Sequence, residues 1–102
     1  MAEFVKAIAA ADLDPGKGTE VNVAGTAVAI FNVGGSYYAI SNTCLHRGGP
    51  LGQGFVEGPT VTCPWHSWTY DVTTGANVVN RELKVPCYET RVEGGQVLVK
   101  VV

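Results

Sequence analysis

Four residues with metal-binding side chains form two short clusters in this sequence of 102 residues. One residue separates Cys44 from His46. Two residues separate Cys63 from His66, and sixteen residues lie between the two clusters. The sequence has no other histidine, and its third cysteine, Cys87, lies outside both clusters. Because thiolates and imidazoles bind zinc and iron–sulfur centres, the pattern indicates a metal site.

The way in which the clusters share their ligands indicates the kind of metal. A single zinc ion could take all four side chains tetrahedrally. Zinc fingers, however, pair cysteine with cysteine and histidine with histidine, whereas each cluster here supplies one residue of each kind. That mixed order favours a binuclear centre, in which two cysteines bind one iron and two histidines bind the other. Nucleophilic catalysis by a cysteine–histidine pair fits poorly, because it would leave a second pair unexplained.

The rest of the sequence predicts an all-β protein. Short runs rich in β-branched and aromatic residues alternate with glycine, asparagine and proline. Strands are expected in 3–8, in three runs within 19–41 with turns at 24–25 and 34–35, in two runs within 60–75, and in a hairpin within 83–102 with its tip at 94–95. A helical turn is expected at 10–13, and a loop without regular structure at 47–54.

The change in sequence pattern along the chain suggests one domain with an insertion. Strand-like sequence flanks a loop-rich stretch that carries all four candidate ligands. We therefore expect residues 1–102 to form a single domain, with a basal part at about 1–41 and 81–102 and an inserted metal-binding subdomain at about 42–80. A domain this small buries a modest core, so a bound metal would help to stabilise it.

Charge and hydropathy narrow the classes of partner. The formal net charge of −2 argues against a nucleic acid or an anionic membrane, both of which need a basic surface. No segment reaches the roughly 18 apolar residues of a membrane span. The apolar run at 7–11 is shorter than a signal-peptide core of about 7–15 residues. These observations predict a cytoplasmic protein, and a monomer is the simplest expectation.

Two motifs carry a family resemblance. "CLHRGGPLGQG" (44–54) and "CPWHSWTYDVTTG" (63–75) resemble the C-x-H and C-x-x-H boxes of Rieske proteins. The stretches at 11–21 and 85–101 resemble the flanking strands of the same domain, so the resemblance covers nearly the whole chain. It implies a Rieske fold, an antiparallel β-sandwich basal domain with an inserted small cluster-binding subdomain, and one [2Fe–2S] cluster.

The resemblance also implies a role for each residue of the two boxes. Cys44 and Cys63 would bind the inner iron as thiolates, and His46 and His66 would bind the outer iron at the edge nearer solvent. Tyr70 would donate a hydrogen bond to a ligand thiolate.

Other residues near the boxes have weaker assignments. Arg47 follows the first histidine, where it either contacts an acidic patch of a partner or is a solvated surface residue. Trp65 and Trp68 flank the second histidine and either shield the cluster, form a docking surface for a partner, or pack within the loop. Pro64 is expected to stiffen that loop, since proline fixes φ. Cys87 matches no ligand position, and we expect a small buried side chain on a strand.

The resemblance implies a carrier of electrons and no catalysis by this chain. It is similar to the small ferredoxins of multicomponent aromatic-ring dioxygenases and monooxygenases, which pass single electrons from a flavin-dependent reductase to a terminal oxygenase. A Rieske oxygenase needs two further histidines and a carboxylate for a mononuclear iron. This sequence has only two histidines. The alternatives are a Rieske-type small subunit of a larger reductase, such as assimilatory nitrite reductase, and a structural zinc module.

The departures from high-potential Rieske proteins predict a low reduction potential. Those proteins carry an extra cysteine in each box, joined as a disulfide, and a serine two residues after the second histidine. The matching positions here are Gly49, Trp65 and Trp68. Fewer hydrogen bonds to the cluster sulfurs make an added electron less stable. We predict a potential in the lower half of the Rieske range of about −150 to +300 mV, and a voltammetric midpoint above about +150 mV would contradict this.

Overall fold

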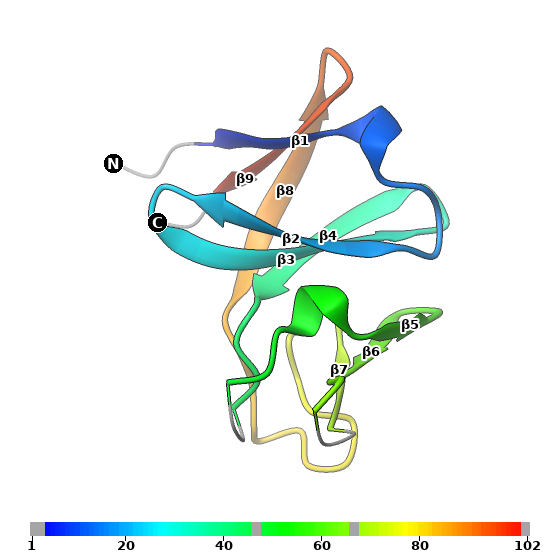
Figure 1. Ribbon diagram of the computed structural model, residues 1–102, viewed down its shortest axis with the longest axis vertical. Helices are drawn as coiled ribbons and strands as arrows, with labels where there is room; N and C mark the ends of the chain where they lie inside the picture. The colour runs from blue at the N-terminus through cyan, green and yellow to red at the C-terminus, as the bar shows by residue number, and fades with distance from the viewer. Residues whose placement is uncertain (1–3, 46–47, 66–67, 101–102) are drawn as a thin grey trace.

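The computed structural model describes residues 4–45, 48–65 and 68–100, which form nine strands and two short 3₁₀ helices (Figure 1). The strands are β1 (Val5–Ala9), β2 (Gly18–Val23), β3 (Thr26–Val33), β4 (Ser36–Ser41), β5 (Phe55–Glu57), β6 (Thr60–Thr62), β7 (Thr69–Asp71), β8 (Cys87–Glu93) and β9 (Gln96–Lys100). The helices are η1 (Ala10–Asp12) and η2 (Leu51–Gln53). No helix in this described part is long and apolar enough to cross a membrane.

Six strands form one antiparallel sheet in the order β1-β9-β8-β4-β3-β2. The sheet bends back on itself, because buried side chains of β9 pack against those of β3 and β4. We call this interior the basal cluster; its buried members are Leu13, Val23, Val28, Ile30, Ala39, Val97 and Val99. The facing halves of the sheet confirm the all-β prediction of an antiparallel sandwich.

A second, three-stranded sheet with the order β5-β6-β7 lies at the opposite end of the molecule (Figure 1). The chain enters this region after β4 and returns to the large sheet at β8. Entry and exit lie together, since the Ser41 N–H donates to the Pro86 carbonyl at 2.8 Å. The small sheet is therefore an insertion between two adjacent strands of the large one. The residue numbers that divide the basal part from the insertion remain a proposal.

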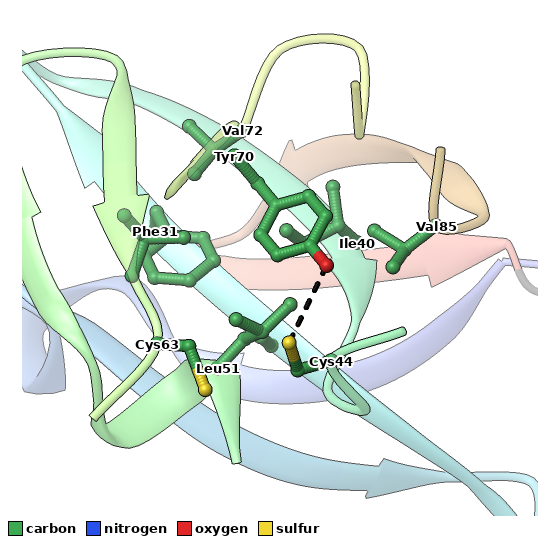
Figure 2. Packing of buried hydrophobic residues seen from close by; sticks show 10 residues of the cluster. Phe31, Ile40, Cys44, Leu51, Cys63, Tyr70, Val72 and Val85 are labelled. Atoms are coloured by element: carbon green, nitrogen blue, oxygen red, sulfur yellow. Dashed lines mark hydrogen bonds between the residues drawn. The ribbon is translucent and has the colours of Figure 1, made fainter. Parts of the chain in front are cut away.

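Strand β3 is buried on both of its faces. Val28 and Ile30 point into the basal cluster, whereas Ala29 and Phe31 point the opposite way, as the two-residue period of a strand requires. The second face belongs to another apolar group, which we call the junction cluster. Its buried members are Ala29, Phe31, Ile40, Cys44, Leu51, Val61, Cys63, Tyr70, Val72 and Val85 (Figure 2). The junction cluster thus joins the insertion to the large sheet.

Paired residues with positive φ close the tight hairpins where the sequence predicted turns. Ala24 and Gly25 have φ of 51° and 85°, and Gly34 and Gly35 have φ of 60° and 96°. Two consecutive residues of this kind match the right-handed twist of the flanking strands. The predicted turns at 24–25, 34–35 and 94–95 are confirmed, as is the helical turn near residue 10.

Three features differ from the sequence prediction. Strand β5 was not predicted, because Phe55 is 72% exposed and the strand has no buried alternation. Helix η2 lies within the stretch predicted to be an irregular loop. Cys87 lies on a strand as expected, but it is exposed, so its predicted burial is wrong. The strand period that turns the neighbouring Tyr88 toward the basal cluster turns Cys87 away from it.

The two clusters predict different effects for the same substitution. Ile30 and Ile40 are fully buried, one in each cluster. Shortening either to valine should lower the free energy of unfolding by about 0.5–1.5 kcal/mol, measured by urea denaturation. Only Ile40→Val should also accelerate chemical labelling of Cys44 and Cys63, followed by mass spectrometry. Equal acceleration in Ile30→Val would contradict the separation of the clusters.

Candidate metal centre

The first loop (residues 42–54) holds Cys44 through its own backbone. The Cys44 N–H donates to the Gly49 carbonyl at 3.0 Å, and the Gly48 N–H donates to the Cys44 carbonyl at 2.9 Å. Closer to the base of the loop, Thr43 and Pro50 form an isolated β-bridge. Gly48 has a φ of 72°, a left-handed conformation that suits glycine. These contacts hold the two described arms of the loop together.

The second loop (residues 63–68) is the tip of the β6–β7 hairpin. Thr62 pairs with Thr69 at the end of the ladder, and their hydroxyls are 3.0 Å apart. One step further, the Cys63 N–H donates to the Trp68 carbonyl at 2.7 Å. The short β-strands therefore place Cys63 at a fixed position at the end of the small sheet.

The two loops bring their thiols into one buried group. Cys44 and Cys63 are each 1% exposed, although both lie outside regular strands. Both belong to the junction cluster together with Leu51 and Tyr70, as Figure 2 shows. Two segments far apart in the sequence thus present their cysteines to the same apolar interior, as the metal-site interpretation requires.

Tyr70 on β7 is placed to donate a hydrogen bond to the thiol of Cys44. Its hydroxyl oxygen lies 3.3 Å from the Cys44 Sγ and accepts a hydrogen bond of 3.2 Å from the Leu45 N–H. Because that N–H can only donate, the single phenolic proton is available to the sulfur. Burial, together with the contact to Cys44, raises the pKa of Tyr70, so the phenol stays protonated at neutral pH. The geometry fits the role that the family resemblance implies for Tyr70.

Gly49 forms a close contact between the loops. A Cβ added at this residue would lie 2.5 Å from the Cys63 Sγ and 3.3 Å from the Trp65 ring. No side chain fits at that distance, so the backbone of the first loop directly covers the thiol of the second. This cradle, with two buried sulfurs, fits a centre held between the loops.

The two tryptophans and the proline of the second box lie in different environments. Trp65 is 62% exposed at the loop tip. Trp68 is half-buried and packs against the junction cluster, whereas Pro64 is half-buried. Trp68 therefore packs within the fold, and Trp65 presents an aromatic surface to solvent.

The histidine assignments rest on the sequence. His46, Arg47 and His66 lie outside the described residues. Their proposed roles as cluster ligands, and as a surface contact for Arg47, stay predictions.

Sequence reasoning missed the polar contacts at the base of the first loop. Asn42 is buried two residues before Cys44, and its side chain contacts Glu20 and Gly52. It also missed an open pocket of about 250 Å³ beside the second loop, lined by Trp68, Thr69, Asn77, Val79, Asn80 and Leu83. No periodic pattern in the sequence marks either feature, because both join residues from separate segments.

The fold and the paired buried thiols define a Rieske protein. A family model for the Rieske [2Fe-2S] domain matches residues 3–89, so the chain belongs to the Rieske family. The cofactor of that family is one [2Fe–2S] cluster, and the described part of both loops fits it through two buried thiols, a phenol that donates to one of them, and a glycine cradle over the other.

Comparison with particular proteins points to ferredoxins. Ferredoxin CarAc of Metapseudomonas resinovorans is 34% identical over 99 residues, which cover 94% of this chain and 92% of that protein. A chain in the complex of reduced oxygenase and oxidised ferredoxin of carbazole 1,9a-dioxygenase has a TM-score of 0.87 and 31% identity, over 95% of this chain and 92% of that chain. A Mycobacterium tuberculosis protein described as an NADH-dependent nitrite reductase small subunit has a TM-score of 0.91 and 26% identity, over 100% of this chain and 97% of that chain.

The contact between Tyr70 and Cys44 predicts a shift in reduction potential. Tyr70→Phe removes one hydrogen-bond donor to a sulfur and leaves the ring in the junction cluster. The midpoint potential should fall by about 40 mV, which corresponds to about 1 kcal/mol for one electron. Protein-film voltammetry of both proteins measures the shift. Tyr38→Phe, a partly buried tyrosine packed on the same cluster, is the matched control and should leave the potential unchanged.

Proposed function

We propose that this protein is a one-electron carrier that passes electrons from a flavin-dependent reductase to the terminal oxygenase of an aromatic-ring dioxygenase system. The similarity to whole ferredoxins carries this proposal, since the match with ferredoxin CarAc covers more than nine-tenths of both proteins. The complex of oxygenase and ferredoxin in a related system supports an oxygenase as the electron acceptor. A cytoplasmic monomer is the form that suits such a carrier.

In this proposal, Cys44 and Cys63 bind one iron of the cluster, and His46 and His66 bind the other. The bound [2Fe–2S] cluster accepts and returns one electron. The sequence has no histidine left for a mononuclear iron, so this chain supplies electrons and leaves substrate oxidation to its partner.

The residues around the thiols have three tasks in this function. The junction cluster excludes water from the cysteine side of the site, because its ten buried members are no more than 2% exposed. Tyr70 donates its proton toward one sulfur and so stabilises negative charge there. Gly49 lets the loop backbone cover the other sulfur. Together they hold the thiolates in a fixed, dry environment, which limits rearrangement when an electron arrives.

A second candidate is a Rieske-type small subunit of nitrite reductase. The specific observation in its favour is the TM-score of 0.91 over the whole of this chain. The sequence identity of 26% is, however, lower than the 34% shared with ferredoxin CarAc. We therefore rank the ferredoxin function first.

Spectroscopy with matched cysteine variants tests the proposed cofactor and its ligands. The anaerobically reduced protein should give a rhombic EPR signal with an average g value below that of the free electron. Cys63→Ala should abolish this signal and the visible absorption. Cys87→Ala removes an exposed thiol that lies on β8, outside both loops, and should change neither. A colourless wild-type protein with one zinc per chain would overturn the proposal in favour of a structural zinc site.

Electron-transfer kinetics distinguish the two candidate functions. Reduced protein mixed with the oxidised Rieske oxygenase of a dioxygenase system should pass its electron to that oxygenase, as followed by stopped-flow absorption. The two proteins should elute separately on gel filtration. Stable coelution with a nitrite reductase large subunit, without electron transfer to the oxygenase, would favour the second candidate.

A further inference from the structure

A single carboxylate fastens the base of the first loop to the large sheet. Glu20 lies on β2, and its Oε2 accepts a hydrogen bond of 2.7 Å from the Asn42 side-chain amide. Its Oε1 accepts a second hydrogen bond from the side-chain amide of Gln53. Asn42 precedes Cys44 by two residues, whereas Gln53 lies at the far end of the loop in η2. The carboxylate therefore bridges both ends of the loop that carries Cys44.

Asn42 is the residue through which this contact reaches the loop. It is 8% exposed, and each of its four polar groups has a partner. Its N–H donates to the Ala27 carbonyl, and its carbonyl accepts from the Leu51 N–H at 2.8 Å. Its side-chain oxygen accepts from the Gly52 N–H at 2.7 Å, and its amide donates to Glu20. Only the last of these bonds reaches a charged group, and bonds to charged groups are the stronger kind.

The backbones of the loop and β2 meet at the same place. A Cβ on Gly52 would lie 2.8 Å from the Glu20 nitrogen and from the carbonyl group of Thr19. The backbone of the loop thus packs directly against the backbone of β2, next to the Glu20 side chain that bridges the two ends of the loop.

The charge state of Glu20 suits a side chain that accepts two hydrogen bonds. The hydrogen bond from Gln53, and then that from Asn42, lower the pKa of the Glu20 carboxyl, so it is ionised at neutral pH. An ionised carboxylate only accepts hydrogen bonds, and both partners are amide donors.

We propose that Glu20 is a positioning residue, which holds the first loop and Cys44 on β2 and thereby limits how fast the loop opens and releases its cluster. The proposal rests on the ligand role of Cys44 in the proposed function. Opening of the loop exposes the buried side of the site without unfolding of the large sheet, because local openings need less free energy than global unfolding.

The test is Glu20→Gln in the protein as purified. Glutamine keeps the shape, but its amide end faces one of the two donors, so one hydrogen bond is lost. Hydrogen exchange followed by mass spectrometry should show about threefold to tenfold faster exchange in peptides of residues 42–54, and unchanged exchange in peptides of β8 and β9. Release of the cluster to an iron chelator, followed by the visible absorption, should accelerate by a similar factor.

Two further variants separate positioning from charge. Glu57→Gln removes another exposed carboxylate, which lies on β5 outside the first loop, and should leave exchange and release unchanged. The double variant Glu20→Gln with Asn42→Asp exchanges amide and carboxylate and permits the same set of hydrogen bonds. It should restore slow exchange in 42–54. Glu57→Gln controls for charge, because it loses the same single charge as Glu20→Gln, whereas the double variant keeps the net charge of the wild type.

Gln53→Ala removes one arm of the bridge and provides an independent measurement if Glu20→Gln gives no folded protein. Wild-type exchange in 42–54 for Gln53→Ala or Glu20→Gln would overturn the proposal, as would equal acceleration in Glu57→Gln. A wild-type protein that lacks iron would instead defeat the proposed function. The exchange measurements would still decide the role of Glu20, because they follow the loop and not the cluster.

Discussion

The burial of β3 on both faces is the constraint on which the rest of the structure depends. This strand supplies side chains to the interior of the large sheet and, from the opposite face, to the cluster that contains Cys44 and Cys63, and its neighbour β4 does the same through Ala39 and Ile40. Each fully buried aliphatic or aromatic side chain contributes on the order of 1.5–3 kcal/mol, so Phe31 and Ile40 tie the insertion to the sheet with several such contributions. The inserted region therefore packs its own buried side chains against one face of the large sheet.

Burying two thiols against this face of the large sheet has an electrostatic consequence. Two thiolates in an apolar interior repel each other and lose hydration. In the proposed function, iron would supply the positive charge that balances the two thiolates. Tyr70 adds a directed hydrogen bond to one sulfur without adding a charge. Metal binding and the packing of the insertion are thus coupled through the same buried atoms.

Much of this arrangement could be predicted from the sequence, for identifiable physical reasons. Paired residues at 24–25 and 34–35 marked hairpins, because positive φ at both central positions favours glycine. The mixed cysteine–histidine clusters indicated a binuclear metal centre, because few other functions need that spacing. Tyr70 followed from the resemblance to Rieske proteins, and its contact with Cys44 is present. The positions of His46 and His66 lie outside the described residues.

The remaining features depend on contacts that local patterns do not encode. Strand β5 carries an exposed Phe55, so its sequence lacks the buried alternation that reveals a strand. Cys87 is exposed because the register of β8 is set by neighbouring strands, whereas cysteine is usually buried. The bridge from Glu20 to Asn42 joins residues 22 positions apart. Polar contacts of this kind leave no period in the sequence, so only the folded chain reveals them.

The cradle at Gly49 bears on how Rieske proteins diverge. A cysteine at this position in the present loop would bring its Cβ within 2.5 Å of the Cys63 sulfur, before any second cysteine existed to pair with it. The first mutational step toward a loop-to-loop disulfide would therefore damage the site, and the second step, at Trp65, would bring no benefit alone. Ancestral loops of a different shape, or simultaneous change at both positions, would be needed to connect the two classes. The spacing between two loops can in this way separate branches of a family that share every cluster ligand.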